Sequence, residues 1–250
     1  WAGTTRTHNR GQMESRTAIF SAPTAADAAG PRTRHGFSPY VNNGGTVLGI
    51  CGSDFAIVAG DTRLSEGYSI SSRTYTKVIQ LTDTTVLATA GMQADFHTLH
   101  KVLLTRVRQY EDDHGHQPST PALAQLLSVI LYSRRFFPYY AFNVLGGVDD
   151  DGKGCVFSYD AVGSFERVQY SASGTGHELV QPLMDQQIGW KDQRATALKP
   201  VLSVEATVDL LKDTFASASE RDIYTGDYLD ICVVQAGKKI SIERCELKFD

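Results

Sequence analysis

Short runs in which apolar and polar residues alternate recur along this chain, and they predict β-strands. The predicted strands cover residues 46–51, 55–59, 69–72, 78–81, 84–90, 141–148, 156–159, 165–171, 228–235 and 240–247. The segments 52–54 and 149–152 are rich in Gly, Asp or Ser, so they predict tight turns that join their flanking strands as hairpins.

Between the strands, apolar residues recur at three- and four-residue steps, which is the period of an amphipathic helix. One predicted helix covers residues 94–112, and another begins at Thr120, the predicted N-cap, with Pro121 in the first helical position. A short helix is predicted over residues 178–187, and a longer one begins near Ser203.

The order of these elements is strands, two helices, strands, two helices, strands. Clustering of this kind favours antiparallel sheets with helices outside them, rather than a parallel sheet with single crossover helices. We therefore predict an α+β fold in which two antiparallel sheets pack face to face between two helical layers. Residues 1–36 are poor in large apolar side chains and predict an arm, while residues 37–250 predict one domain.

Composition narrows the function classes. The chain has 250 residues, of which 42% are hydrophobic and 21% charged, with a net charge of −4. These values are ordinary for a globular protein and give no reason to expect a nucleic-acid partner. No apolar run approaches the roughly 20 residues that span a membrane, and the N-terminal segment lacks an apolar core of the secretory type, so neither a membrane partner nor a signal peptide is expected.

The cysteines and histidines do not predict a metal site. The four cysteines lie in apolar or alternating stretches without Cys-x-x-Cys spacing, so we expect buried thiols in a reducing compartment: Cys51, Cys155, Cys232 and Cys245. Four of the seven histidines form two close pairs, which we interpret as surface residues because no third ligand lies nearby: His97 with His100 and His114 with His116. No cofactor is predicted.

The candidate chemistry lies in three evenly spaced residues, Gly45, Asp61 and Lys77. A hydrolase that uses its own first residue needs a hydroxyl or thiol there, a free α-amino group as base, a lysine nearby and an aspartate that fixes the lysine. Asp61 and Lys77 supply the charged partners, but glycine stands where the attacking side chain belongs. Taken singly, Asp61 could cap a turn, Lys77 could be a solvated surface residue and Gly45 a flexible strand entry.

Several longer motifs carry a family resemblance over residues 37–250. They are Phe-Ser-Pro-Tyr at 37–40, Asn-Gly-Gly-Thr at 43–46, Ala-Ile-Val-Ala-Gly-Asp-Thr-Arg-Leu-Ser-Glu-Gly at 56–67, Leu-Tyr-Ser-Arg-Arg-Phe-Phe-Pro-Tyr-Tyr at 131–140 and Glu-Arg-Asp-Ile-Tyr-Thr-Gly-Asp at 220–227. With these motifs the chain resembles the beta subunits of the 20S proteasome, which have the N-terminal-nucleophile hydrolase fold, and it is most similar to the non-catalytic beta-6 type.

The resemblance implies an αββα sandwich in a seven-membered beta ring that contacts other beta subunits in the same and the opposite ring and the subunits of an alpha ring. It implies a cytoplasmic and nuclear location and a part in ATP- and ubiquitin-dependent protein degradation. The vestigial catalytic frame would comprise Gly45, Asp61, Lys77, Gly91, Asp222 and Thr225. Gly174-Thr175 replaces the usual serine-bearing turn, and Thr225 replaces a serine.

Two alternatives remain open from the sequence. The chain could be an active threonine peptidase that uses Thr46 after cleavage behind Gly45, although a one-residue slip along a strand points the hydroxyl to the opposite face. It could also be a free-standing hydrolase of the same fold. A further Gly-Thr-Thr sequence at residues 3–5 is interpreted as chance, because no alternating strand follows it.

The segment 134–140 combines two arginines with four aromatic residues. Aromatic side chains dominate both cores and interfaces. The segment is therefore either a helix end whose aromatics fill the core or, in part, an anchor between subunits.

Overall fold

The computed structural model describes residues 38–191 and 202–249 of the chain. The described residues from Tyr40 onward form one compact unit. The predicted arm at residues 1–36 lies outside the described residues.

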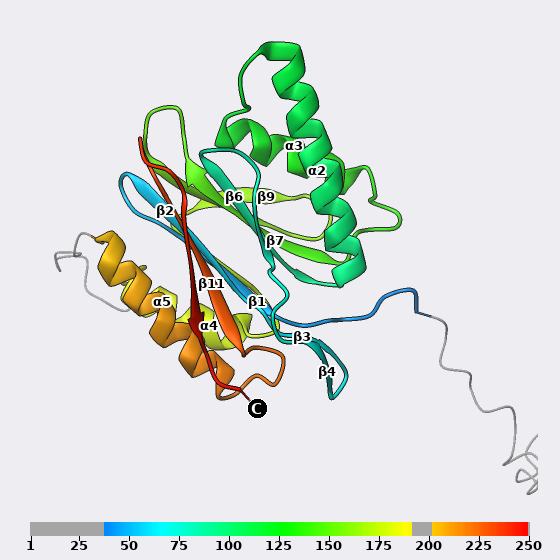
Figure 1. The fold of residues 1–250 in the computed structure, drawn as a ribbon, viewed down its shortest axis with the longest axis vertical. Coiled ribbons are helices and arrows are strands. Elements are labelled where there is room, and N and C mark those ends of the chain that lie inside the picture. The colour runs from blue at the N-terminus through cyan, green and yellow to red at the C-terminus, as the bar shows by residue number, and fades with distance from the viewer. Residues whose placement is uncertain (1–37, 192–201, 250) are drawn as a thin grey trace, which may run out of the picture. The chain divides into compact units, whose positions relative to one another are not determined.

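Two five-stranded antiparallel sheets form the centre of this unit (Figure 1). The first sheet has the order β10-β1-β2-β11-β12, with bounds Tyr170–Gly174, Thr46–Cys51, Phe55–Asp61, Tyr228–Gln235 and Ser241–Glu246. The second has the order β5-β6-β7-β8-β9, with bounds Val78–Gln80, Thr85–Gly91, Ala141–Val148, Gly154–Tyr159 and Phe165–Val168. A separate ribbon pairs β3 (Leu64–Glu66) with β4 (Ser69–Ser72).

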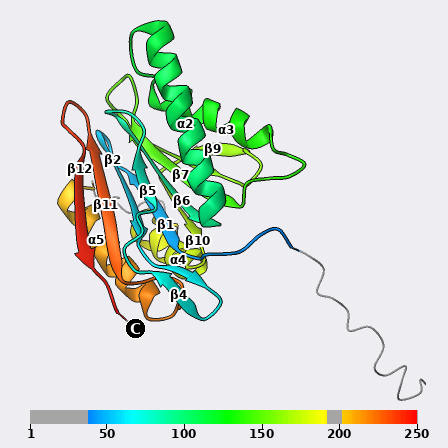
Figure 2. The same ribbon diagram turned by 45° about the vertical axis from the view of Figure 1, so that its right-hand side comes forward.

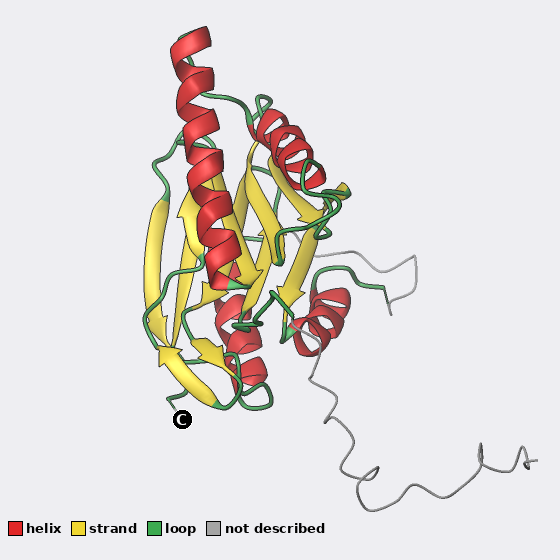
Figure 3. Ribbon diagram, turned by 90° about the vertical axis from the view of Figure 1, so that its right-hand side faces the viewer, coloured by secondary structure: helices red, strands yellow, loops and turns green. Residues whose placement is uncertain are grey.

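Helices cover the outer face of each sheet, as the views in Figures 2 and 3 show. Helices α2 (Gln93–His114) and α3 (Thr120–Tyr132) pack on the second sheet, and their apolar stripes share a core with its outward-facing residues. Helices α4 (His177–Gln187) and α5 (Val204–Ser219) do the same on the first sheet. A third, Val- and Ala-rich core lies between the sheets. The predicted four-layer αββα sandwich is therefore confirmed.

Burial on both faces explains why the central strands are apolar throughout. Every residue of β1, β2 and β6 is buried, because one face of each strand meets the opposite sheet and the other meets helices or loops. The predicted hairpin of β1 and β2 is confirmed, with Val47 opposite Gly60 and Cys51 opposite Ala56. This register puts the start of β1 beside the end of β2.

Three details differ from the prediction. The strand predicted over residues 165–171 is two strands, β9 and β10, which belong to different sheets, because the chain crosses between the layers at Gln169. The short strand β3 was not predicted, since Leu64 is the only apolar residue among its three. Helix α3 has Ser119 rather than Thr120 as its N-cap: the Ser119 side chain accepts a hydrogen bond from the Ala122 amide. Thr120 is instead buried and donates to the Val148 carbonyl at 2.8 Å.

The prediction that His100 lies on the surface is wrong. Its side chain is buried beneath α2, and its Nε2 lies 3.0 Å from the Thr89 hydroxyl, which donates to Asn143 Oδ1 at 2.9 Å. Desolvation is the main reason that the pKa of His100 is lowered from 6.5 to about 4, with a smaller contribution from His97. The other three histidines of the two pairs are exposed, and all four cysteines are free thiols, of which Cys245 is only half-buried.

Acid should therefore destabilise the fold through His100. The unfolded chain binds this proton near pH 6.5 and the folded chain only near pH 4, so stability falls as the pH drops from 6.5 towards 4. The loss should reach on the order of 3 kcal/mol at pH 4. Urea unfolding across this range, compared with His100→Leu, measures it. The variant should show a shallower fall, and equal slopes would contradict the assignment.

Candidate functional site

A buried ion pair lies where β2 of the first sheet ends and β5 of the second sheet begins. Asp61 is the last residue of β2, and Lys77 directly precedes β5, so each sheet contributes one partner. The Lys77 ammonium donates to Asp61 Oδ1 at 2.9 Å, to the Asp61 carbonyl at 3.0 Å and to the Arg63 carbonyl at 2.5 Å. Both side chains are fully buried. Each of the three ammonium hydrogens thus has an acceptor.

Burial acts against both charges of this pair. Desolvation lowers the pKa of Lys77 and raises the pKa of Asp61, and in each case the opposite charge of the partner works against that shift. Each group therefore depends on the other to remain ionised. A pair of this kind is held by geometry and hydrogen bonds rather than by net attraction alone.

Backbone amides complete the coordination of the Asp61 carboxylate. The amide of Thr46 donates to Oδ1 at 2.8 Å, and the amides of Arg63 and Gly226 donate to Oδ2 at 3.2 and 3.4 Å. The carboxylate therefore joins the start of β1, the loop after β2 and the loop before β11.

Gly45 lies directly against Lys77. Its φ is +91°, in the region that favours glycine, and a Cβ built on it would stand 2.3 Å from Lys77 Cε and 2.6 Å from Lys77 Nζ. Its carbonyl accepts a hydrogen bond from the Thr175 amide at 2.9 Å. The structure thus brings Gly45, Asp61 and Lys77 to one spot, where a side chain on residue 45 would require the end of the Lys77 side chain to move.

A second group of polar side chains lies on the other side of Gly45. Asp222 Oδ2 accepts hydrogen bonds from the hydroxyls of Thr225 at 2.6 Å and Thr175 at 2.7 Å. The Thr225 hydroxyl is also 2.7 Å from the hydroxyl of Thr46. Asp222, Thr225 and Thr175 are therefore neighbours, linked to the first cluster through Thr46.

The geometry of Thr46 is unsuited to a nucleophile. Its residue is fully buried, and its hydroxyl accepts from the Gly176 amide at 2.9 Å besides meeting Thr225. Its nitrogen donates to the Asp61 carboxylate at 2.8 Å. The hydroxyl meets Thr225 and Gly176, whereas a side chain at Gly45 would meet Lys77.

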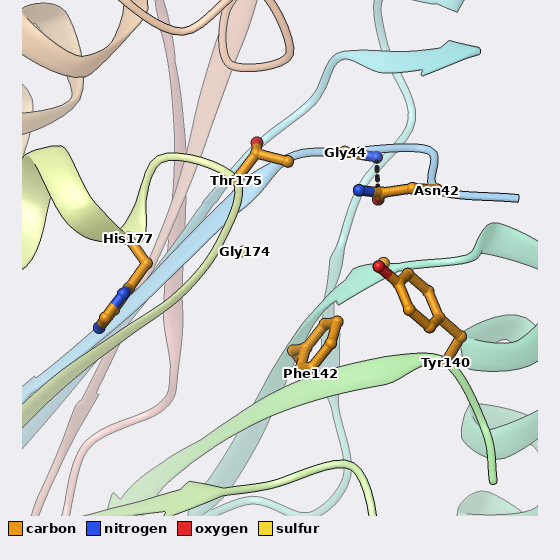
Figure 4. A pocket seen from close by; sticks show the side chains of 8 residues that line it. Asn42, Gly44, Tyr140, Phe142, Gly174, Thr175 and His177 are labelled. Atoms are coloured by element: carbon orange, nitrogen blue, oxygen red, sulfur yellow. Dashed lines mark hydrogen bonds between the residues drawn. The ribbon is translucent and has the colours of Figure 1, made fainter. Parts of the chain in front are cut away.

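Gly91 ends β6 at the edge of a cavity of about 350 Å³ (Figure 4). Its φ is +120°, and a Cβ there would stand 2.5 Å from the Tyr140 carbonyl oxygen. Aromatic rings from the β7 side face the turn before α4 across this space. The lining residues are Asn42, Gly44, Gly91, Tyr140, Phe142, Gly174, Thr175 and His177.

Two features of the site were not predicted from the sequence. Arg63 and Asp227 form a second buried ion pair, in which Arg63 Nε lies 2.9 Å from Asp227 Oδ2. This pair fixes the position of Arg63, whose backbone carbonyl accepts a hydrogen bond from Lys77. The Asn43 side chain links two segments, because its Nδ2 donates to the Ser65 carbonyl and its Oδ1 accepts from the Gln93 amide. Its position before two glycines, a sequence typical of turns, was the only local signal.

Within residues 38–191 and 202–249, no helix is long and apolar enough to cross a membrane. The same residues contain no cluster of three or more His, Cys, Asp or Glu side chains that could hold a metal ion.

Comparison with known proteins identifies a family. Residues 41–234 match the family model described as proteasome subunit. Proteasome subunit beta type-1 of Dictyostelium discoideum is 48% identical over 235 residues, which span 94% of this chain and 99% of that protein. The protein of the same name from Arabidopsis thaliana is 52% identical over 218 residues, spanning 86% of this chain and 97% of its own length. Proteasome subunit beta type-6 of Saccharomyces cerevisiae is 41% identical over 225 residues, spanning 87% and 93%.

Proposed function

Because this chain belongs to the proteasome subunit family, we propose that it is a non-catalytic beta subunit of the 20S core particle, in which Gly45 replaces the attacking threonine. The observation that carries this proposal is the contact between Gly45 and Lys77. The charged partners of a threonine peptidase are in place, but the residue beside them has no side-chain oxygen, and a Cβ there would overlap the lysine.

The likeness to beta type-1 and beta type-6 relatives is compatible with a subunit of the beta-6 type. We expect its partners to be beta subunits of both rings and subunits of the alpha ring, in cytoplasm and nucleus, within a particle that carries out ATP- and ubiquitin-dependent degradation.

Exposed aromatic side chains support a role in subunit contacts. Phe136 is 99% exposed and Phe137 58% exposed, in the loop after α3, while Tyr139 of the same segment is 9% exposed and belongs to the core. The segment 134–140 is therefore divided between core and surface. Large exposed aromatic residues next to arginines are typical of interfaces.

Labelling of the assembled particle tests the proposal. A peptide epoxyketone, which forms a covalent adduct with an N-terminal threonine, is added to particles that contain this chain, and each subunit is then analysed by mass spectrometry. We expect the particle to hydrolyse peptides and other beta subunits to be labelled, while this chain stays unmodified. An adduct on Thr46 of this chain would overturn the proposal, and peptidase activity of the chain as a monomer would point to a free-standing hydrolase.

A further inference from the structure

The C-terminal end of α2 extends past the two sheets, as Figures 1 and 3 show. Three rings lie together there: Tyr110 and His114 belong to the last turns of the helix, and His116 belongs to the connection that leads to α3. Both histidines are exposed. The Tyr110 ring stacks on the His114 ring with the centroids 4.1 Å apart, and its centroid lies 5.7 Å from that of His116.

The end of the helix at Gly115 brings the two histidines together. Residues two apart on a helix do not face each other, so a continued helix would separate these rings. Gly115 instead has a φ of +75°, and its amide donates to the Glu111 carbonyl at 2.8 Å, which closes the helix with a glycine in the left-handed conformation. The chain turns back here, and the imidazole centroids of His114 and His116 lie 6.2 Å apart.

The same ring nitrogen is engaged in both histidines. His114 Nδ1 lies 2.9 Å from the Tyr110 carbonyl oxygen, and His116 Nδ1 lies 3.0 Å from the Gln117 carbonyl oxygen. A carbonyl oxygen only accepts hydrogen bonds, so Nδ1 carries the hydrogen in each ring, and in the neutral ring the lone pair belongs to Nε2. Within residues 38–191 and 202–249, neither Nε2 has a hydrogen-bond partner.

Histidines that bind metal ions have this arrangement. A metal-ligating imidazole almost always donates its other N–H to a carbonyl, a carboxylate or water, which fixes its tautomer and its orientation. With metal–nitrogen bonds of 2.0–2.1 Å, the centroids of two imidazoles on one ion lie at most about 6.4 Å apart. The observed distance of 6.2 Å is within this limit, so the separation of the rings permits a shared ion.

We propose that His114 and His116 form a binding site for a divalent late transition-metal ion, with Zn²⁺ as the representative, through Nε2 of each ring. Imidazole ligands suit Zn²⁺, Cu²⁺ and Ni²⁺, whereas Mg²⁺ and Ca²⁺ prefer oxygen ligands. The chain supplies two ligands and water completes the coordination, so the site is open, unlike a structural zinc site with four protein ligands.

Such an ion would link two segments of the chain. His114 ends α2, and His116 lies in the connection before α3, so an ion bound to both fixes the connection to the helix end. An ion that binds only the folded arrangement stabilises it by mass action. The proposal does not depend on the proposed function, because this end of α2 contributes no residue to the cleft around Gly45.

Titration of the full chain with Zn²⁺ in a calorimeter tests the proposal. The variants His114→Gln and His116→Gln each remove one ligand. His97→Gln is the matched control, because His97 is an exposed histidine on the same helix but lies outside the ring group. Thermal unfolding with and without excess Zn²⁺ is then measured for the same four proteins.

We expect Zn²⁺ to bind the unchanged chain at least ten-fold more tightly than either His114→Gln or His116→Gln, and to raise the unfolding temperature of the unchanged chain more than that of these two variants. His97→Gln should match the unchanged chain in both measurements. Equal Zn²⁺ affinity in the unchanged chain and in either ligand variant would overturn the proposal. An equal loss in His97→Gln would also overturn it, since Zn²⁺ would then bind scattered surface histidines. The epoxyketone experiment does not involve these residues, so each proposal can fail without the other.

Discussion

Replacing Lys77 by Met is expected to destabilise the full chain by about 3–5 kcal/mol, because it leaves the Asp61 carboxylate buried without its counter-charge. The deficit should depend on pH. Without the ammonium, burial raises the pKa of Asp61 further, so protonation relieves the penalty and stability is lost as the pH rises above that pKa. In urea unfolding, the loss in free energy of unfolding relative to the unchanged chain should therefore be smaller at pH 5 than at pH 8.

The double variant Lys77→Met with Asp61→Asn is the control for this interpretation. It removes both charges while keeping an oxygen that can accept from the Thr46 amide. It should recover a large part of the lost stability and remove the difference between pH 5 and pH 8. A double variant as unstable as the single one would mean that lost packing, rather than an unpaired charge, dominates.

Replacing Gly45 by Thr is expected to destabilise the chain by roughly 2–5 kcal/mol and to leave it unlabelled by the epoxyketone. A β-branched residue at φ +91° is strained, and its Cβ would overlap Lys77 Cε, so conformational strain and overpacking add. Stability is measured by denaturant unfolding and labelling in assembled particles.

The same substitution at Gly67 separates the two contributions. Gly67 has a φ of +57°, with nothing within 4 Å of a built Cβ, so Gly67→Thr should cost only the conformational part, about 1–2 kcal/mol. If Gly45→Thr costs no more than Gly67→Thr, the cleft has room for the side chain. A labelled Gly45→Thr subunit would show that restoring the hydroxyl is enough to restore reactivity.

The fold was predictable from the sequence where one pattern persists over many residues. The long stripe of α2 and the two alternating runs joined at residues 52–54 identified a helix and a hairpin within a few residues. The break at Gln169 was not predictable, because β9 and β10 continue one alternating pattern, and only packing assigns them to different sheets. The prediction for His100 failed for a related reason. The sequence places the imidazole on a helix but does not show that Thr89 and Asn143 lie beside it in the core.

The site was predictable only in part. Even spacing and family resemblance indicated Gly45, Asp61 and Lys77. Asp61 ends a strand and the other two directly precede one, and the strand register brings all three to the same end of the sandwich. Asn43 could not be identified in this way. Its role depends on Ser65 and Gly91, which are distant in the sequence and meet it only after the sheets have formed.

The Lys77–Asp61 contact bridges β2 of one sheet and the start of β5 of the other. It therefore links the two sheets of the sandwich, and this structural role does not require that the site catalyse a reaction. This creates an asymmetry in how such a cleft can change over evolution. The attacking hydroxyl can be lost through one substitution of a small side chain at little cost to the stability of the fold. Loss of either charge, in contrast, leaves the other charge buried without its partner and destabilises the fold. The presence of both the aspartate and the lysine in a chain of this fold is consequently weak evidence that the chain is an active enzyme.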